Sequence, residues 1–174
     1  MEVILSIDAG TTGVRSLLVD KSGIIVESSY REFPQYFPEA GQVEHDANEI
    51  WDAIKETIGD VIYKFGGQPE AIGITNQRET IVCWDKRSSD PLHRALVWQD
   101  RRTSGICEKL QKEGKEKQFY EKTGLILDAY FSGTKVIWIL DQDPELRKAA
   151  EQGELADLRE NEEKAGGGGG GGGG

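Results

Sequence analysis

Residues 3–31 read VILSIDAGTTGVRSLLVDKSGIIVESSYR, three apolar runs joined by two short turns. The runs at 3–7, 14–20 and 24–31 are short and rich in branched apolar side chains, which is typical of buried strands. Because short turns let neighbouring strands pair at a low cost in loop-closure entropy, the stretch predicts an antiparallel three-strand meander.

Strand and helix patterns alternate after this meander. Asp46 is predicted to cap a helix that runs to about Tyr63, with Glu49 completing a capping-box pair and Gly66 and Gly67 ending the helix. Further strands are predicted at 71–75, 80–85 and 96–98, and helices at 103–113, 116–123, 133–141 and from Pro144. This order predicts an α/β fold with a mixed sheet flanked by helices, in which residues 71–75 join the meander's sheet.

Composition excludes several classes of protein. The net charge of −10 does not favour nucleic-acid or anionic-membrane partners, although it leaves room for an anionic small ligand held by backbone N–H groups. No stretch approaches the roughly 18 apolar residues of a membrane span, and residues 3–7 are too short for a signal peptide. Cys83 and Cys107 lack metal-site spacing, which indicates reduced thiols in a cytoplasmic protein.

The loop after the first strand is a candidate phosphate and metal site. Gly10 permits close approach of a ligand to the backbone, and Thr11 and Thr12 offer hydroxyl and N–H donors to phosphate oxygens. Asp8 is suited to hold Mg²⁺, and Arg15 is placed to reach the same anion. A plain hairpin uses similar residues, so this pattern alone leaves both interpretations open.

Two further segments carry candidate ligand contacts. Arg78 and Glu79 are either a surface ion pair or a polyol clamp, in which the guanidinium donates to hydroxyl oxygens and the carboxylate accepts their protons. Trp98 is either a core residue or a wall against a ligand's carbons. Tyr130 offers a phenolic hydroxyl to a ligand.

Two structural expectations accompany these candidates. Residues 100–102, Asp-Arg-Arg, are expected to tether their loop through internal ion pairs. Ser132 is expected to cap the helix that follows it.

Five motifs together resemble one family. Residues 8–15, 43–46, 73–80, 95–103 and 123–135 occur in an order and spacing similar to the glycerol kinase branch of the FGGY carbohydrate kinases. That family belongs to the actin-like, RNase H-fold ATPase superfamily. The resemblance runs from about residue 3 to residue 155, and implies an actin-like, RNase H-like α/β domain.

The resemblance assigns roles to the candidate residues. Arg78 and Glu79 match the glycerol hydroxyl clamp, Trp98 the wall against its carbons, and Tyr130 a further hydroxyl contact. Asp8 matches the magnesium-side carboxylate, and the loop that meets the ATP phosphates is matched by Gly10, Thr11, Thr12 and Arg15. The implied activity is ATP-dependent phosphorylation of glycerol to glycerol 3-phosphate, with ATP and Mg²⁺, in a cytoplasmic homo-oligomer.

Three positions depart from the branch's usual pattern. Ala9 stands where glycerol kinases usually have Gln, Gln42 replaces a usual Trp, and Ala129 replaces a usual Pro. None of them removes an expected contact. The change at Ala9 keeps an FGGY kinase for another polyol or sugar as an alternative.

The domain organisation is expected to be incomplete. Residues 1–155 are interpreted as an N-terminal FGGY kinase domain, and residues 156–174, an acidic segment followed by glycines 166–174, as a linker or tag. The resemblance implies a second domain with the adenosine pocket and the general base. No catalytic residue is therefore assigned here, and the chain alone is expected to be a catalytically inactive actin-like fragment.

Overall fold

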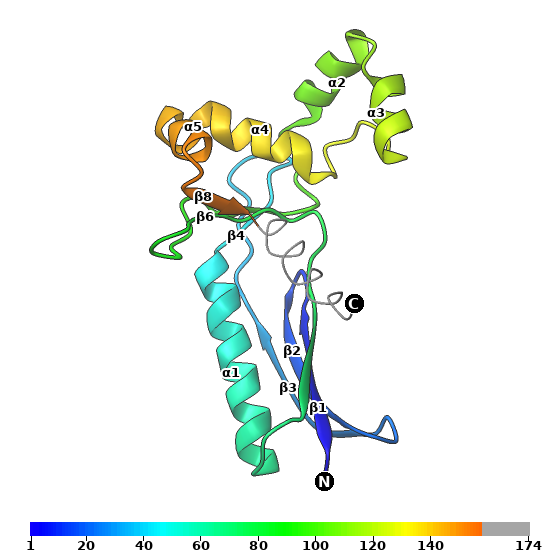
Figure 1. The fold of residues 1–174 in the computed structure, drawn as a ribbon, viewed down its shortest axis with the longest axis vertical. Helices are drawn as coiled ribbons and strands as arrows, with labels where there is room; N and C mark the ends of the chain where they lie inside the picture. The colour runs from blue at the N-terminus through cyan, green and yellow to red at the C-terminus, as the bar shows by residue number, and fades with distance from the viewer. Residues whose placement is uncertain (158–174) are drawn as a thin grey trace, which may run out of the picture. The chain divides into compact units, whose positions relative to one another are not determined.

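A computed structural model describes residues 1–157 of the chain. They form two compact units, Met1–Glu79 and a second unit that begins at Thr80. Figure 1 draws the helices and strands of both units.

The first unit is built on a four-stranded sheet in the order β3-β2-β1-β5. Its strands are β1 (Val3–Ala9), β2 (Gly13–Asp20), β3 (Ile25–Glu32) and β5 (Ala71–Thr75). β1 and β2 pair antiparallel, as do β2 and β3, while β5 lies parallel to the other edge of β1. The predicted meander, the addition of residues 71–75 and the mixed character of the sheet are all confirmed.

Alternation along β1 decides which face of this sheet is covered. Val3, Leu5, Ile7 and Ala9 are buried, whereas the residues between them are exposed or half-buried. Helix α1 (Ala47–Phe65) packs on the buried face, against β2 and β3, as Figure 1 shows. The other face of β1 carries Ile4, Ser6 and Asp8, of which Ile4 and Asp8 are exposed.

The segment before α1 contains β4 (Glu44–His45), and the helix begins and ends where its capping residues predict. Asp46 accepts a hydrogen bond from the N–H of Asn48, and Gly66, with φ of 70°, ends the helix in the left-handed region. The predicted capping-box role of Glu49 is wrong. Its Oε1 accepts from the hydroxyl of Tyr36 at 2.8 Å, because the preceding loop brings that phenol over the first helical turn.

The second unit combines short strands with helices. Its strands are β6 (Cys83–Asp85), β7 (Ala95–Leu96) and β8 (Leu155–Asp157), and its helices are α2 (Ser104–Lys112), α3 (Glu116–Thr123), α4 (Ser132–Gln142) and α5 (Pro144–Glu151). β6 and β8 pair antiparallel, and α4 packs against α5. The side chains of Cys83, Leu96 and Ile139 form a small core, with Trp138 and Leu146 against it.

Several boundaries in this unit differ from prediction. The strand predicted at 80–85 is regular only from Cys83, and Ile81 forms an isolated bridge with Leu96. The strand predicted at 96–98 lies one residue earlier and is shorter. Ser132 does not cap α4 but begins it, and Phe131 occupies the cap position without a side-chain hydrogen bond. Such short elements are defined by tertiary partners, which periodicity along the chain does not reveal.

The end of the described chain also shifts a boundary. Residues 156 and 157, predicted to belong to a tail, are part of β8. Residues 158–174, which include the glycine run, lie outside the described residues. Within residues 1–157, no helix combines the length and the apolarity that crossing a bilayer requires.

Gly13 at the start of β2 provides a test of this packing. A Cβ built there would lie 2.5 Å from the backbone oxygen of Arg31 and 2.6 Å from the hydroxyl of Tyr30. Gly13→Ala should therefore lower the free energy of unfolding by about 1–3 kcal/mol, as overpacking does. Urea denaturation of the whole chain measures this change.

Gly59 in α1 is the matched control, because a Cβ there meets nothing within 4 Å. Gly59→Ala should raise the free energy of unfolding by roughly 0.5–1 kcal/mol, since alanine restricts the unfolded chain and favours helix. Equal effects at the two glycines would contradict the close approach of β2 and β3.

Candidate functional site

The candidate phosphate loop is the tight connection between β1 and β2. The last ladder pair is Ala9 with Val14, and the N–H of Gly10 donates to the oxygen of Gly13 at 3.0 Å, which leaves Thr11 and Thr12 at the tip. Because the turn is closed by its own backbone, the tip projects beyond the end of the sheet. Both threonines are at least partly accessible there.

Asp8 and Arg15 are opposite each other on the next pair of the same ladder. Both are exposed and lie on the face of the sheet that α1 does not cover. Asp8 also pairs with Thr75 at the end of β5. The structure thus brings Asp8, the loop and Arg15 together at one end of the sheet.

Tyr30 of β3, which belongs to none of the predicted sites, supports this end of the hairpin. Its hydroxyl lies 3.5 Å from Oγ1 of Thr12, and the guanidinium carbon of Arg15 lies 5.5 Å from the centre of its ring. The phenol therefore contacts two of the predicted phosphate-binding residues. The register of the meander could have predicted this contact, because it places Arg15 opposite Tyr30.

Gln77 and His45, which also belong to none of the predicted sites, form a second support. The side-chain amide nitrogen of Gln77 donates to the oxygen of Gly10 at 2.9 Å and lies 3.3 Å from Nδ1 of His45. The ring of His45 is buried and packs edge-on against Phe33, with 5.0 Å between ring centroids. Burial lowers the pKa of His45 to about 4, so the ring is neutral at pH 7. Both residues lie inside motifs noted above, but no spacing rule joins them.

Arg78 and Glu79 lie in a turn that follows β5, at the end of the first unit. Arg78 is exposed and Glu79 is half-buried. Glu79 has a φ of 66°, in the left-handed region that side chains other than glycine adopt at a cost of about 1–2 kcal/mol. Such strain is concentrated at functional turns, and it is consistent with a carboxylate held in one direction.

Trp98 and Tyr130 contact each other in the second unit. Their ring centroids are 5.8 Å apart, with an interplanar angle of 65°, and both side chains are half-buried. The N–H of Trp98 donates to Oγ1 of Thr80 at 3.2 Å. The two residues predicted to contact a polyol in this unit therefore form one aromatic corner.

The backbone around Tyr130 is held by charged groups. Asp128 accepts from the N–H of Tyr130 at 2.7 Å and from both terminal nitrogens of Arg101, at 2.6 and 3.2 Å. The hydrogen bond from Arg101 is the main cause that lowers the pKa of Asp128. The ammonium group of Lys135, fully buried, donates to the oxygens of Ala129 and Tyr130 at 2.6 Å each.

The expected tether at residues 100–102 is present. Arg102 binds both carboxylate oxygens of Asp100 at 2.9–3.0 Å, and the two side chains are 5% and 0% exposed. The guanidinium of Arg102 also lies 4.6 Å from the ring centre of Trp138. Removing one partner of such a buried pair is strongly destabilising, so the pair holds the loop in this conformation.

The predicted site residues divide between the two units. The first contains Asp8, Gly10, Thr11, Thr12, Arg15, Arg78 and Glu79, and the second contains Trp98 and Tyr130. Within residues 1–157, no group of three or more His, Cys, Asp or Glu side chains is placed to hold a metal ion. Asp8 alone nevertheless fits Mg²⁺, because this ion is usually held by one or two carboxylates together with substrate phosphates.

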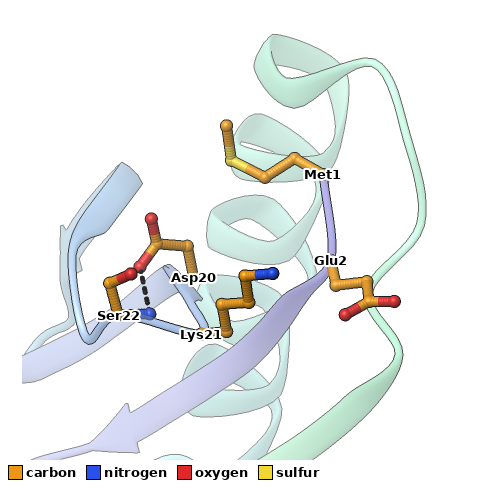
Figure 2. Close-up of a pocket in the computed structure, with 5 residues that line it drawn as sticks. All are labelled: Met1, Glu2, Asp20, Lys21 and Ser22. Atoms are coloured by element: carbon orange, nitrogen blue, oxygen red, sulfur yellow. Dashed lines mark hydrogen bonds between the residues drawn. The ribbon is translucent and has the colours of Figure 1, made fainter.

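A cavity of about 510 Å³ lies at the opposite end of the β1–β2 hairpin. Met1, Glu2, Asp20, Lys21 and Ser22 line it, and Figure 2 shows the N–H of Ser22 donating to the carboxylate of Asp20. Val3 pairs with Asp20 at this end, six ladder pairs from Ala9, or roughly 20 Å at the rise of a strand. The cavity therefore takes no part in the candidate site.

Comparison with known proteins links this arrangement to carbohydrate kinases. The model of the N-terminal domain of the FGGY family of carbohydrate kinases matches residues 3–157. The glycerol kinase of Bacillus subtilis (strain 168) is 55% identical over 155 residues, which are 87% of this chain and 31% of that protein. The glycerol kinase of Oceanobacillus iheyensis is 54% identical over 156 residues, 88% of this chain and 31% of that protein.

Solved structures give the same result. The crystal structure of Plasmodium falciparum glycerol kinase with ADP matches with a TM-score of 0.88 and 30% identity, covering 90% of this chain and 32% of that one. A ligand-bound xylulose kinase from Lactobacillus acidophilus matches with a TM-score of 0.76 and 27% identity, covering 83% of this chain and 29% of that one. The predicted actin-like, RNase H-like α/β fold class is confirmed. The chain spans about a third of the length of these relatives.

The Arg101–Asp128 pair predicts a pH-dependent stability. The pKa of Asp128 is lower in the folded chain than the ordinary aspartate pKa of about 3.9. Its negative charge therefore stabilises the fold at pH values above about 3.9. This stabilisation is lost as the pH falls through the folded-state pKa. Asp128→Asn should lower the free energy of unfolding by about 1 kcal/mol at pH 7, a value reduced for solvent screening of the half-exposed Arg101.

Denaturation of both proteins at several pH values measures this difference, which should shrink below about pH 4 as the wild-type carboxyl becomes protonated. Asp52→Asn is the control, because Asp52 pairs with Lys55 on an exposed helix surface and should change stability by less than about 0.5 kcal/mol. A difference at Asp128 that stays constant down to pH 2 would show that its charge contributes nothing.

Proposed function

The chain belongs to the FGGY family of carbohydrate kinases, and we propose that it is the N-terminal part of a glycerol kinase, which transfers the γ-phosphoryl group of ATP to a terminal hydroxyl of glycerol. The observation that carries this proposal is the grouping of candidate residues at the end of β1. There Asp8, the loop and Arg15 lie within two pairs of one ladder. Gln77, next to Arg78 in the chain, donates to the same loop. Similarity to glycerol kinases at 50–55% identity supports glycerol as the acceptor.

The loop is proposed to bind the phosphates of ATP. Its accessible tip offers the N–H and hydroxyl groups of Thr11 and Thr12, Gly10 leaves the backbone open, and Arg15 adds a positive charge on the adjacent pair. Asp8 would hold Mg²⁺, which supplies charge neutralisation on the phosphates. Phosphoryl transfer requires chiefly positioning and charge neutralisation, and these groups provide both.

Glycerol is proposed to contact the four residues that the family resemblance assigns to it, and the role of each is considered by itself. Arg78 would donate to hydroxyl oxygens and Glu79 would accept their protons, with the left-handed backbone of Glu79 fixing the carboxylate's direction. Trp98 would cover the carbons, and Tyr130 would give its hydroxyl. The contacts from Asp128 and Lys135 restrict the backbone of Tyr130, which favours one orientation of that phenol.

The alternative in the same family is a kinase for another polyol or sugar. Ala9 departs from the usual glycerol kinase pattern, and the match to a xylulose kinase supports a sugar acceptor. The longer enzyme is the full-length protein of which this chain is proposed to be the N-terminal part. A panel of glycerol, xylulose and related polyols, tested with ATP on the longer enzyme, separates the two proposals. A preference for a sugar over glycerol by tenfold or more in kcat/KM would replace the glycerol proposal.

The cellular setting is also a proposal. We infer a cytoplasmic enzyme that acts as a homo-oligomer, with no nucleic-acid or membrane partner. Two buried free thiols, Cys83 and Cys107, support a reducing compartment. The net charge of −10 argues against polyanionic partners.

Arg78→Ala tests the substrate assignment in the longer enzyme. Loss of a charged donor to a hydroxyl should cost on the order of 2–3 kcal/mol, or roughly 30- to 150-fold in KM for glycerol, with KM for ATP within about twofold. Steady-state kinetics with each substrate varied in turn measure both constants. Arg87→Ala is the control, since the side chain of Arg87 is 89% exposed and Arg87 is not among the candidate site residues. Equal weakening of glycerol and ATP would place the glycerol site elsewhere.

The 174-residue chain alone is expected to be inactive. With Asp8 assigned to Mg²⁺ and Glu79 to the hydroxyl clamp, we assign no general base within residues 1–157, and relatives are about three times as long. In-line transfer needs the acceptor, its base and the phosphates held in one closed site. A coupled ATP assay on the purified chain should give no glycerol-dependent turnover. Turnover near ~10 per second, the median for enzymes, would show that the base is present here.

A further inference from the structure

Three distant segments of the first unit meet at the side chain of Gln77. Its amide nitrogen donates to the oxygen of Gly10, 67 residues earlier, at 2.9 Å. The same nitrogen lies 3.3 Å from Nδ1 of His45, 32 residues earlier. One amide thus contacts the loop after β1 and the strand β4 while itself following β5.

The chemistry of these two contacts defines the state of His45. An amide nitrogen has two hydrogens, and a carbonyl oxygen is only an acceptor, so the second hydrogen is directed to Nδ1 of the ring. Nδ1 must then be unprotonated, which puts the ring proton on Nε2. The Nε2 atom is buried and has no hydrogen-bond partner within residues 1–157.

The surroundings of His45 keep its Nδ1 atom unprotonated. His45 is fully buried and its ring packs edge-on against Phe33. Burial disfavours the imidazolium and lowers the pKa to about 4, so the ring stays neutral at physiological pH. A neutral ring keeps Nδ1 available to Gln77.

The position of Gln77 in the chain links two proposed subsites. It immediately precedes Arg78 and Glu79, the proposed polyol clamp, and it lies two residues beyond Thr75, which pairs with Asp8. Through Gly10 it also reaches the proposed phosphate loop. The backbone of the clamp and the backbone of the loop are therefore joined by one side chain as well as by the sheet.

We propose that Gln77 is a positioning residue that fixes the phosphate loop to the strand end carrying the polyol clamp, with His45 as its second, permanent acceptor. This inference rests on the proposed function. The amide touches no substrate in this role. It sets the distance between donor and acceptor subsites, and a displacement of about 1 Å there is enough to slow transfer about 100-fold.

Kinetics of the longer enzyme test the positioning role. Gln77→Leu and the isosteric Gln77→Glu both remove the donor to Gly10, and the glutamate keeps the volume. Both should lower kcat about 10- to 100-fold with KM for glycerol changed less than threefold, because Arg78 and Glu79 remain. Gln68→Leu, at an exposed glutamine of the same unit, should leave kcat unchanged.

Two kinetic outcomes overturn the proposal. A Gln77→Glu enzyme with wild-type kcat would show that Gln77 only fills space. A rise in KM for glycerol without loss of kcat would make it a binding residue instead. Thermal melting of each variant shows whether it is folded at the assay temperature.

Nuclear magnetic resonance of the 174-residue chain tests the bridge without any assay of activity. The chain has two histidines. The nitrogen shifts of His45 at pH 7 should show a neutral ring protonated on Nε2. His93, whose Nδ1 lies 2.6 Å from the oxygen of Arg94, should carry a proton on Nδ1 and serves as an internal reference. Gln77→Leu should shift the amide resonances of Gly10 and Thr11, and Gln68→Leu should not.

The two tests separate the possible failures. A proton on Nδ1 of His45, or unchanged loop resonances in Gln77→Leu, would overturn the bridge whatever the activity. A wild-type longer enzyme that does not phosphorylate glycerol would contradict the proposed function, and the histidine measurement then decides whether the bridge exists.

Discussion

The structure of the first unit depends on the pairing of β1 on both edges. β2 occupies one edge in an antiparallel ladder, β5 occupies the other in a parallel one, and α1 covers the face that carries Leu5 and Ile7. With its hydrogen bonds and one face used in this way, β1 can direct functional groups only from its far face and its end. This constraint places Asp8 and the loop where a ligand can reach them.

The same constraint gathers residues from distant segments. A parallel partner on β1 requires a crossover, which α1 provides. The crossover returns the chain at the start of β5, and the last residue of β5, Thr75, lies beside Asp8. The residues that follow β5 therefore arrive next to the loop, and Gln77 bonds Gly10 there. The strained backbone of Glu79 comes two residues later. The strained backbone of Glu79 and the long-range contact of Gln77 thus lie at one end of the sheet, whereas the cavity at the other end contains none of the candidate residues.

The second unit buries charged groups beside its apolar residues. Its small cluster around Ile139 is accompanied by a fully buried Lys135 and by the buried pair of Asp100 and Arg102. These groups bond to backbone or to one another, which offsets the cost of burying charge. The consequence is a loop geometry that holds Tyr130 against Trp98.

The sequence by itself determined the elements whose signals are local. The apolar runs, the turns and the capping residues Asp46 and Gly66 identified the meander and α1, because side-chain periodicity and backbone preference act over a few residues. The motifs around Asp8, Arg78, Trp98 and Tyr130 likewise identified the family. Only the tertiary structure decided the partners of Glu49, the short strands around Ile81 and Leu96, the support from Tyr30, and the bridge from Gln77 to Gly10 and His45. These contacts join residues that are 13 to 67 positions apart. Strand register and packing decide which of the available donors and acceptors meet. No short stretch of sequence carries a signal for either.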